Sequence, residues 1–338
     1  MLPKDQTVML PTDSAVSIRN VTKTYEQWQR SNEAKNIIRN LIHPSKRIIT
    51  ALDDVSFDVK QGEFVAYAGP NGAGKSTTMK ILSGMLQPTS GQVSVLGLSP
   101  QRDRIALMQR IGVLFGNRTE LWWDHPVIQS FDWKRVVWNI RADRYKTMLD
   151  KVTELLDLQD ILHTFARELS LGQRAKADLA MLLLHEPELI LLDEPTIGLD
   201  VLAKRQIISF LKELNREKGT TVIVTSHDMD DLEEMARRIL LISSGRTAFD
   251  GSFETLRTTT GSLCRMVLTM RSSEVPRITH TRLISSEENV CEYEFDRNLT
   301  PMAAVLRQVS VLEGLEDVEI RKAPIEDVIA GLYMKWKE

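Results

Sequence analysis

The apolar positions of the chain follow two different periods, and their alternation predicts an α/β fold. Short runs of consecutive or alternating apolar residues, typical of strands, are separated by segments with apolar residues at every third or fourth position, typical of helices. Strands that alternate with helices favour a largely parallel sheet with crossover connections. The predicted strands are residues 15–20, 55–59, 64–68, 93–96, 111–115, 189–192, 220–225 and 239–243, and the predicted helices are 77–86, 103–109, 171–184, 202–214 and 230–237.

A long central block shows only the helical period. Between residues 127 and 166 the apolar positions recur at three- and four-residue spacing, as at Val136, Ile140, Val152 and Leu156. No strand pattern interrupts this block. We therefore predict a helical subdomain, at about residues 116–170, inserted between parts of the α/β sheet.

The stretch 26–49 lies between two predicted strands and has a pattern of its own. Apolar residues recur there at helical spacing, basic residues surround them, and Pro44 would end the helix. A basic amphipathic helix can lie on a membrane surface or against a partner protein. More often such a helix covers the core of its own domain, and we favour that interpretation. The apolar positions are Ala34, Ile37, Ile38, Leu41 and Ile42, and the basic ones are Arg30, Lys35, Arg39, Lys46 and Arg47.

A second pattern begins after a polar linker at residues 258–261. Predicted strands and helices are mixed there without regular alternation, which indicates a small α+β domain of residues 258–338 with a ferredoxin-like topology. Residues 1–14 show no periodicity and are expected to be a tail, so the main domain is 15–257. The strands of the small domain are 264–270, 282–285, 290–295 and 318–321, and its helices are 302–309 and 325–336.

Composition and charge exclude several classes of protein. The 338 residues carry a net charge of −3, so no global basic field indicates nucleic-acid binding. No apolar run is long enough to span a bilayer, and residues 1–20 do not resemble a signal peptide. The two cysteines, Cys264 and Cys291, lack the spacing of a zinc or disulfide framework, which fits a reducing compartment. We expect a cytoplasmic chain that another protein would hold at any membrane.

A glycine-rich loop follows the predicted strand 64–68 and precedes the predicted helix 77–86. In that context the pattern GxxxxGK[ST] is a phosphate-binding loop, whereas a turn with a surface lysine would not need this order of elements. Glycines let backbone N–H groups converge on an anion, and the helix N-terminus adds further donors. Lys75 can reach the β- and γ-phosphates of a nucleoside triphosphate, and the Ser76 hydroxyl can bind Mg²⁺. The loop consists of Gly69, Pro70, Asn71, Gly72, Ala73, Gly74, Lys75 and Ser76.

Two adjacent carboxylates follow an apolar strand. The run 189–192 leads directly to Asp193 and Glu194. At the carboxyl end of a parallel strand, these side chains would lie at the edge where such sheets bind ligands. Asp193 suits a Mg²⁺ ligand, direct or through water, and Glu194 suits a general base that polarises an attacking water. The two carboxylates could instead cap the next element, but the phosphate-binding loop in the same domain favours catalysis.

A third motif, LSLGQR at residues 169–174, lies between the helical block and the helix that follows it. LSxGQ between a GxxxxGKS loop and an apolar strand that ends in Asp-Glu resembles the ATP-binding cassette (ABC) ATPases in order and spacing. The resemblance covers roughly residues 15–254. It implies a P-loop NTPase cassette: a mixed, largely parallel core sheet with an antiparallel β part and a helical subdomain. The segments FGNRTELWWD (115–124), LSLGQR and DEPTIGLD (193–200) are most similar to cassettes that drive ABC-2-type export permeases.

The resemblance implies roles for further residues. Ser170, Gly172 and Gln173 match the family signature, which contacts the γ-phosphate bound by the opposite subunit. A hydroxyl, a glycine N–H and a helix N-terminus together can form such an anion clamp. His227 matches the switch histidine that hydrogen-bonds the γ-phosphate or its attacking water. Asp200 matches the loop that runs between the two ATP sites.

Four more positions complete the comparison with the family. Thr77 extends the match of the triphosphate loop. Tyr25 matches the aromatic residue that stacks on adenine, although the stretch 26–49 separates it from the loop and a strand-end tyrosine is the alternative. Asn117 stands where the family has a glutamine that contacts Mg²⁺ or water, so its shorter amide implies a weaker or indirect contact. Leu171 stands where glycine is commoner in the signature.

The resemblance implies an ATP-hydrolysing subunit that requires ATP and Mg²⁺, pairs with a second ABC ATPase subunit and acts on a separate permease at the inner face of the cell membrane. Export is favoured over import because the helix-containing tail 263–338 resembles exporter tails. A soluble ATPase that acts in translation or on nucleic acid is disfavoured, because the chain lacks a second cassette, heptad arms and a basic field. Trp122 and Trp123 either contact the permease or cap the core of the helical subdomain.

Overall fold

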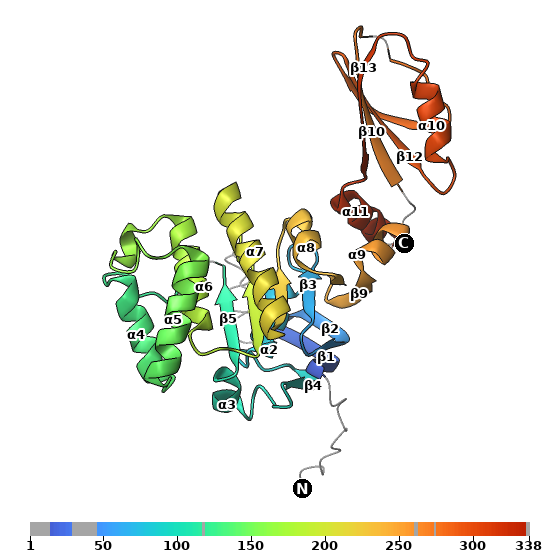
Figure 1. The fold of residues 1–338 in the computed structure, drawn as a ribbon. Helices are drawn as coiled ribbons and strands as arrows, with labels where there is room; N and C mark the ends of the chain where they lie inside the picture. Colours follow the sequence, from blue (N-terminus) through green and yellow to red (C-terminus); the bar gives the residue numbers. More distant parts are fainter. Residues whose placement is uncertain (1–13, 29–45, 117–118, 260–262, 274, 336–338) are drawn as a thin grey trace, which may run out of the picture. The chain divides into compact units, whose positions relative to one another are not determined.

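The computed structural model describes residues 14–28, 46–116, 119–259, 263–273 and 275–335. The chain divides into two compact units, Met1–Asp250 and Gly251–Glu338 (Figure 1). The division therefore lies before the boundary at residues 257–258 that the sequence predicts. Thr258 and Thr259, expected in a linker, form the end of helix α9 (Phe253–Thr259), where both hydroxyls donate to the Thr255 carbonyl oxygen at 2.8 Å.

The first unit is built on a six-stranded sheet with the order β5-β6-β7-β3-β8-β9, in which β5, β6, β7, β3 and β8 are parallel. Every residue of β3 and β7 is buried, as expected for strands that are covered on both faces. The predicted crossover helices connect the strands. The bounds are β3 Phe64–Ala68, β5 Ile111–Phe115, β6 Leu189–Asp193, β7 Thr221–Thr225, β8 Arg238–Ser243, β9 Arg246–Ser252, α2 Lys75–Leu82, α3 Arg104–Met108, α7 Val201–Lys218 and α8 Met229–Met235.

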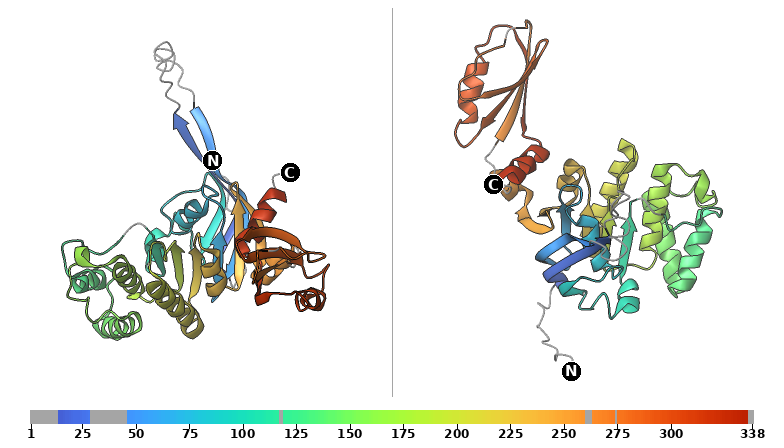
Figure 2. Two further views of the ribbon diagram at one scale, coloured as in Figure 1. Left: turned by 90° about the horizontal axis from the view of Figure 1, so that it is seen from above. Right: turned by 180° about the vertical axis from the view of Figure 1, so that it is seen from behind.

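A second, antiparallel sheet with the order β2-β1-β4 packs against this core. Its strands are β1 (Ser14–Trp28), β2 (Lys46–Lys60) and β4 (Ser90–Val95). The pairing of β1 with β4 ends at Thr22, so the distal half of the β1–β2 hairpin projects from the sheet (Figure 2, left).

The structure describes only the two ends of the stretch 26–49, in which a helix is expected. Both ends are strand, because Glu26 pairs with Ile48 and Gln27 with Arg47 across the hairpin. Isoleucine and threonine at residues 48–50 favour a strand, and pairing with β1 decides the conformation there. Residues 29–45, which carry all the apolar helical positions and Pro44, lie outside the described residues, so the helix stays a prediction.

The predicted helical subdomain lies beside β5 (Figure 1). It contains α4 (Val127–Val137), α5 (Ala142–Leu156), a short 3₁₀ helix (Ala166–Glu168) and the start of α6 (Leu171–Leu183). The buried residues of α5 are Tyr145, Met148, Val152 and Leu156, at the three- and four-residue spacing that predicts one apolar face.

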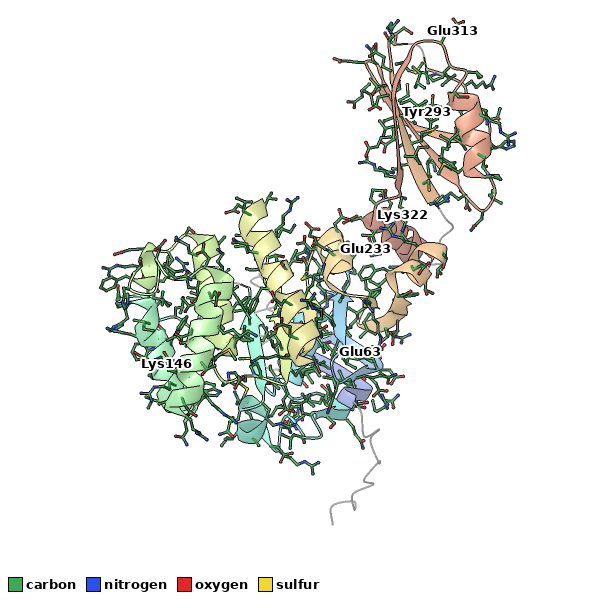
Figure 3. All side chains as sticks on the ribbon, viewed as in Figure 1. Glu63, Lys146, Glu233, Tyr293, Glu313 and Lys322 are labelled. Carbon is green, nitrogen blue, oxygen red and sulfur yellow. The ribbon has the colours of Figure 1, made fainter. Side chains whose placement is uncertain are left out.

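The second unit is a four-stranded antiparallel sheet with the order β11-β12-β10-β13, and α10 packs on one of its faces. Tyr293 belongs to the core between the sheet and α10 (Figure 3). The ferredoxin-like expectation is wrong, because that topology needs a helix after the first strand and the described residues between β10 and β11 contain none. Cys264 and Cys291 are buried and unpaired. The bounds are β10 Leu263–Met270, β11 Arg282–Glu287, β12 Val290–Asp296, α10 Met302–Val309, β13 Leu315–Lys322 and α11 Ile325–Lys335.

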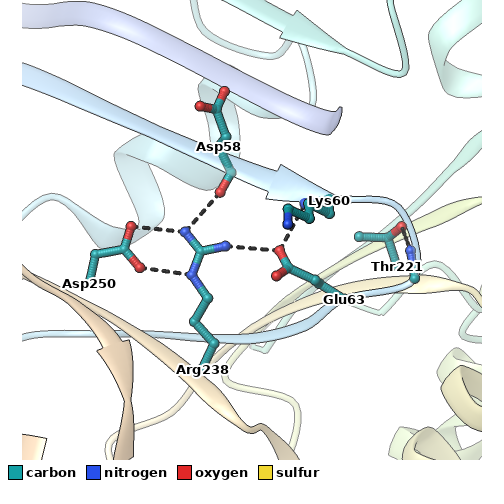
Figure 4. A network of polar contacts seen from close by, with 7 residues as sticks. Asp58, Lys60, Glu63, Thr221, Arg238 and Asp250 are labelled. Atoms are coloured by element: carbon teal, nitrogen blue, oxygen red, sulfur yellow. Dashed lines mark hydrogen bonds and ion pairs between the residues drawn. The ribbon is translucent and has the colours of Figure 1, made fainter. Parts of the chain in front are cut away.

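Arg238, at the start of β8, ties several strands of the first unit together (Figure 4). Its guanidinium donates to both carboxylate oxygens of Asp250 at 2.7 and 2.8 Å, to Glu63 at 2.8 Å and to the Asp58 carbonyl oxygen at 2.9 Å. The bidentate bond to Asp250, together with the charge of Glu63, raises the pKa of Arg238. The network therefore joins β2, the turn before β3, and β9 at one edge of the core sheet.

We expect Arg238→Ala to lower the free energy of unfolding of the first unit by about 2–4 kcal/mol, because it leaves Glu63 and Asp250 without their shared cation. Urea denaturation followed by circular dichroism measures this loss. Arg246→Ala is the matched control, since the Arg246 side chain is 72 % exposed and its pair with Asp53 lies at the surface. It should cost less than about 1 kcal/mol. Equal losses in the two variants would contradict a special role of the network.

Candidate active site

Three neighbouring strands deliver the predicted chemical residues to one edge of the core sheet. The glycine-rich loop follows β3, Asp193 is the last residue of β6, and His227 follows β7 by two residues. In the sheet, β6 lies next to β7 and β7 next to β3, all parallel. Because parallel strands end at the same edge, the loop and the two strand ends converge there.

The loop folds around the Lys75 side chain. Lys75 is 6 % exposed, and its ammonium group donates to the carbonyl oxygens of Gly69 at 2.6 Å and Pro70 at 3.3 Å. Burial lowers the pKa of Lys75, while the charges of Glu194 and Asp193 oppose that shift. The cation is therefore held at the mouth of the loop, facing the two carboxylates.

The glycines of the loop have a structural reason as well as a chemical one. Gly74 precedes α2 with a φ of 111°, and a Cβ atom there would lie 2.6 Å from the Ala51 carbonyl oxygen. Gly72 has a φ of 78°, and a Cβ atom there would meet no atom within 4 Å. The positive φ favours glycine at both positions, and at Gly74 the packing against Ala51 requires it as well.

Glu194 and His227 contact each other directly. The Glu194 carboxylate lies 2.6 Å from His227 Nε2, and the side chains are 21 % and 49 % exposed. Glu194 has a φ of 60°, a conformation that few non-glycine residues adopt, and its N–H is held by the Thr225 carbonyl oxygen at 3.1 Å. A constrained backbone therefore aims this carboxylate at the histidine.

Thr225 is a site residue that the sequence reasoning missed. Its hydroxyl donates to Asp193 Oδ1 at 2.6 Å and lies 3.1 Å from the Glu194 N–H. The signal was present as a hydroxyl residue at the end of the strand that precedes His227. The bond leaves the second carboxylate oxygen of Asp193 available for another ligand.

The arrangement fits a nucleotide-bound Mg²⁺ ion. Ser76, Asp193 and Glu194 line one pocket of about 240 Å³, together with Lys80, Phe115 and Gly116. The described residues contain no cluster of three or more histidine, cysteine or acidic side chains that could hold a metal ion alone. Mg²⁺ at such sites uses one or two protein oxygens and takes its other ligands from phosphate and water, so one hydroxyl and one carboxylate suffice.

The signature residues form the beginning of α6. Ser170 is its N-cap: the hydroxyl accepts from the Gln173 N–H at 3.2 Å, while the Ser170 N–H donates to the Gln173 side chain at 2.9 Å. This capping box occupies the Gln173 amide oxygen but leaves the Ser170 hydroxyl proton free to donate. The backbone N–H groups of Leu171 and Gly172 make no hydrogen bond within the part of the chain that the structure describes. The turn therefore presents donors, as an anion site requires.

Asp200 lies close to this turn. It is the N-cap of α7, and its carboxylate accepts from the Ala203 N–H at 2.9 Å. A Cβ atom on Gly172 would lie 3.1 Å from Ala203 Cβ, so the first turns of α6 and α7 pack closely. Gly172 is therefore needed for this contact as well as for anion access.

The comparisons with known proteins agree with this geometry. The family model described as ABC transporter matches residues 52–197. The ABC transporter ATP-binding protein NatA of Bacillus subtilis is 30 % identical over 211 residues, which are 62 % of this chain and 85 % of that protein. This chain belongs to the ATP-binding proteins of ABC transporters. The uncharacterized ABC transporter ATP-binding protein YhcH of Bacillus subtilis is 36 % identical over 63 % of this chain and 67 % of that protein.

Another relative of this ABC protein has a name that states import. The methionine import ATP-binding protein MetN of Carboxydothermus hydrogenoformans is 32 % identical over 64 % of this chain and 65 % of that protein. Among solved structures, the dimeric cassette MJ0796 bound to ADP and Pi has a TM-score of 0.58 and 26 % identity, over 70 % of this chain and 98 % of that one. The predicted cassette fold is confirmed.

The remaining predicted positions of the ABC cassette are Tyr25, Asn117 and Thr77. Tyr25 lies in the hairpin opposite Ile49, 40 % exposed, with the Lys23 ammonium 5.2 Å from its ring centre. It is not among the residues that line the pocket of Ser76 and Asp193. Asn117 lies outside the described residues. Thr77 is on α2, directly after Ser76.

Trp122 and Trp123 are 38 % and 49 % exposed at the helical subdomain. The Trp122 ring lies 5.5 Å from the Trp133 ring, and the Arg174 guanidinium lies 4.6 Å from the Trp123 ring. The pair therefore both contacts its own subdomain and presents an aromatic surface. None of the helices in the described ranges has the length and apolar character needed to cross a bilayer.

A second residue that the sequence reasoning missed is Asp178, a buried aspartate on α6. It is 8 % exposed, and its Oδ1 accepts from the Thr119 hydroxyl at 2.8 Å and from the Glu120 N–H at 3.1 Å. Burial raises the pKa of Asp178 to about 6, and the Glu120 charge adds to the shift, while the two hydrogen bonds and the charge of Arg174 oppose it. An acidic residue within the apolar run of α6 was the available signal.

The raised pKa of Asp178 predicts a pH dependence. A carboxyl whose pKa is higher in the folded chain stabilises the fold while it is protonated, and this contribution is lost as the pH rises through about 6. Asp178→Asn removes that titration and keeps an acceptor oxygen. Between about pH 4.5 and pH 7.5 the free energy of unfolding of the parent should therefore fall by about 2 kcal/mol relative to the variant. Denaturation of both proteins across this range measures the difference, and a constant difference would contradict the assignment.

Proposed function

We propose that this chain is the ATP-hydrolysing subunit of an ABC export complex and that it couples the closure of a pair of cassettes to a separate ABC-2-type permease. The contact of 2.6 Å between Glu194 and His227 carries the proposal, because it joins a general base to a second polar group beside a phosphate-binding loop. We place the chain in the cytoplasm, on the inner face of the cell membrane, and expect no nucleic-acid partner.

In this proposal the loop residues bind and orient the triphosphate. Lys75 and the N–H groups at the start of α2 hold the β- and γ-phosphates, and Ser76 with Asp193 would hold Mg²⁺. The bound Mg²⁺ would neutralise charge on the phosphates as the bond to the leaving ADP breaks. Thr225 keeps Asp193 oriented through its hydrogen bond.

Glu194 acts as the general base. Its carboxylate accepts the proton of the water that attacks the γ-phosphorus, while the ADP oxygen leaves from the opposite side. His227 Nε2 can donate to one oxygen of Glu194, so that the other oxygen remains directed at the water. The exposed imidazole is also free to reorient towards the γ-phosphate.

The signature turn serves the nucleotide of a second subunit. Ser170, Leu171 and Gly172 present free donors at an exposed helix N-terminus, and the resemblance to the family assigns this turn to the opposite site. ATP then favours the closed pair, because the γ-phosphate supplies contacts that only the pair can make. Hydrolysis removes those contacts and reopens it. The dimeric state of the similar solved cassette supports this arrangement.

Import is the second candidate, since a methionine import ATP-binding protein is among the relatives. We favour export because the signature and its flanking segments are most similar to ABC-2 cassettes. The second unit also combines an open four-stranded sheet with helices, as exporter tails do. Co-purification followed by identification of the membrane partner distinguishes the two. A permease without an extracellular binding protein supports export, whereas a dependence of transport on such a binding protein would support import.

We expect Glu194→Gln to bind ATP, to lose turnover by about a hundredfold or more, and to accumulate as a pair of chains, because the base is lost while the γ-phosphate contacts remain. Gel filtration with and without ATP measures the pairing, and phosphate release measures the turnover. Lys75→Ala is the control, since it should not bind ATP and should stay unpaired. A Glu194→Gln protein that binds ATP but remains a single chain would contradict the sandwich arrangement.

We expect the double variant Trp122→Ala, Trp123→Ala to lose co-purification with the permease, because exposed aromatic residues act as anchors of interfaces. The nucleotide affinity of the unpaired chain should change by less than about twofold, since neither residue lines the pocket of Ser76 and Glu194. Ile105→Ala, which alters an 82 % exposed side chain on α3, is the matched control. Unchanged recovery of the permease would assign the tryptophans to the subdomain's own core.

A further inference from the structure

A short segment between β5 and α4 is hydrogen-bonded at nearly every residue. We call residues 119–123 the strap. The Leu121 N–H donates to the Thr119 hydroxyl oxygen at 3.1 Å, and the Trp122 N–H donates to the buried Ser130 hydroxyl oxygen on α4 at 2.9 Å. Leu121 itself is 5 % exposed. The strap is therefore a fixed piece of structure despite the absence of helix or strand.

The signature helix α6 holds the strap at both ends. At one end Asp178 Oδ1 accepts from the Thr119 hydroxyl and the Glu120 N–H. At the other end the Arg174 guanidinium covers the Trp123 ring at 4.6 Å, a distance at which a cation and an aromatic face attract. The two contacts come from residues four apart on one helix, so they lie on the same face.

The N-cap of the same helix continues this row. Ser170, Arg174 and Asp178 follow each other at four-residue spacing from the first turn of α6. The second half of the helix is fixed in the core, because residues 177–183 are all buried. A displacement of the strap relative to α6 can therefore reach the signature turn through this row. A second link is the Arg167 N–H, which donates to the Trp123 carbonyl oxygen at 3.1 Å three residues before Ser170.

The strap is also close in sequence to the hydrolysis site. Gly116 follows β5, and its N–H donates to the Asp193 carbonyl oxygen at 2.7 Å. A Cβ atom on Gly116 would lie 2.7 Å from the Glu194 carbonyl oxygen, so the chain passes in direct contact with the catalytic strand end. Three residues later Thr119 is bound to Asp178.

Because Asp178 is buried, its two hydrogen bonds are expected to stabilise the contact between the strap and α6. Placing a carboxyl group among apolar residues costs free energy unless its acceptors are used. Asp178 sits between Ala177 and Leu179, which are both buried, and its carboxylate forms no salt bridge within the described residues. The only hydrogen bonds of this side chain in that part of the chain are those to the strap.

We propose that Asp178 is a positioning residue: it fastens the strap to α6, so that the exposed Trp122–Trp123 surface and the Ser170 turn move as one piece. The functional consequence rests on the proposed function, in which the Ser170 turn binds the nucleotide of the second chain. Loosening the strap would then weaken pairing without affecting the nucleotide site of a single chain.

Two substitutions separate the hydrogen bonds from the charge. Asp178→Ala removes the acceptor and leaves the Thr119 hydroxyl and the Glu120 N–H unpaired. Asp178→Asn keeps an oxygen that can accept both bonds, and it is the matched control. Thr119→Val removes one donor from the strap side and serves as a second test should Asp178→Ala fold poorly.

Hydrogen exchange of the full chain tests the fastening directly. In Asp178→Ala, the amides of residues 119–123 should exchange about tenfold faster, and the first turn of α6 should exchange faster as well. Asp178→Asn should exchange like the parent, and Thr119→Val should lie between them. Unchanged exchange of residues 119–123 in Asp178→Ala, or equal acceleration in Asp178→Asn, overturns the proposal.

Pairing in the Glu194→Gln background tests the consequence. Asp178→Ala should raise the ATP concentration needed for half-maximal pairing about fivefold or more, while the nucleotide affinity of the unpaired chain changes by less than about twofold. Asp178→Asn should restore pairing. If strap exchange depends on Asp178 but pairing does not, the coupling is refuted while the proposed function stands. If Glu194→Gln never pairs, the proposed function fails, and the exchange experiment still decides whether Asp178 fastens the strap.

Discussion

Asp193 lies opposite Thr225 in the parallel pairing of β6 with β7, and the position of the hydrolytic groups depends on this register. A shift by one residue would exchange the two faces of a strand and would separate Glu194 from His227. Thr225 secures the register chemically, because its hydroxyl binds Asp193 and its carbonyl oxygen holds the Glu194 N–H. The network around Arg238 stabilises the same sheet at another edge, between β2, the turn before β3, and β9.

The turns to which we assign ligand binding are also helix N-termini. Gly74 precedes α2, Ser170 caps α6 and Asp200 caps α7. Helix N-termini carry N–H groups that the helix cannot satisfy, so anion binding and helix initiation draw on the same donors. In α6 the capping box satisfies the third N–H of the helix and leaves the earlier ones open. The signature sequence therefore shapes a stable helix start with the same few side chains that we propose bind an anion.

The sequence alone predicts the elements whose pattern of residues is local. The loop 69–76, the strand that ends at Asp193 and the core strands of the second unit follow from short-range patterns, and the structure contains them. The long β1–β2 hairpin was not predictable, because its distal half depends on cross-strand pairing between residues distant in the sequence, such as that of Tyr25 with Ile49. Likewise the order of strands in the second unit depends on contacts between distant segments. The contacts of Asp178 were not predictable, because its partners, Thr119 and Glu120, are far from it in the sequence.

Helix α6 is anchored in the core through its second half, where Leu179, Leu182 and Leu183 are nearly inaccessible to solvent. Ser170, Arg174 and Asp178 follow one row along about 12 Å of this helix, given a rise of 1.5 Å per residue. A helix is stiff over that length, so a force applied at Asp178 reaches Ser170 with little loss. A polar fastening suits this purpose better than an apolar one, because hydrogen bonds fix direction as well as distance. Its energetic cost is the burial of a carboxyl group, which the raised pKa of Asp178 reflects.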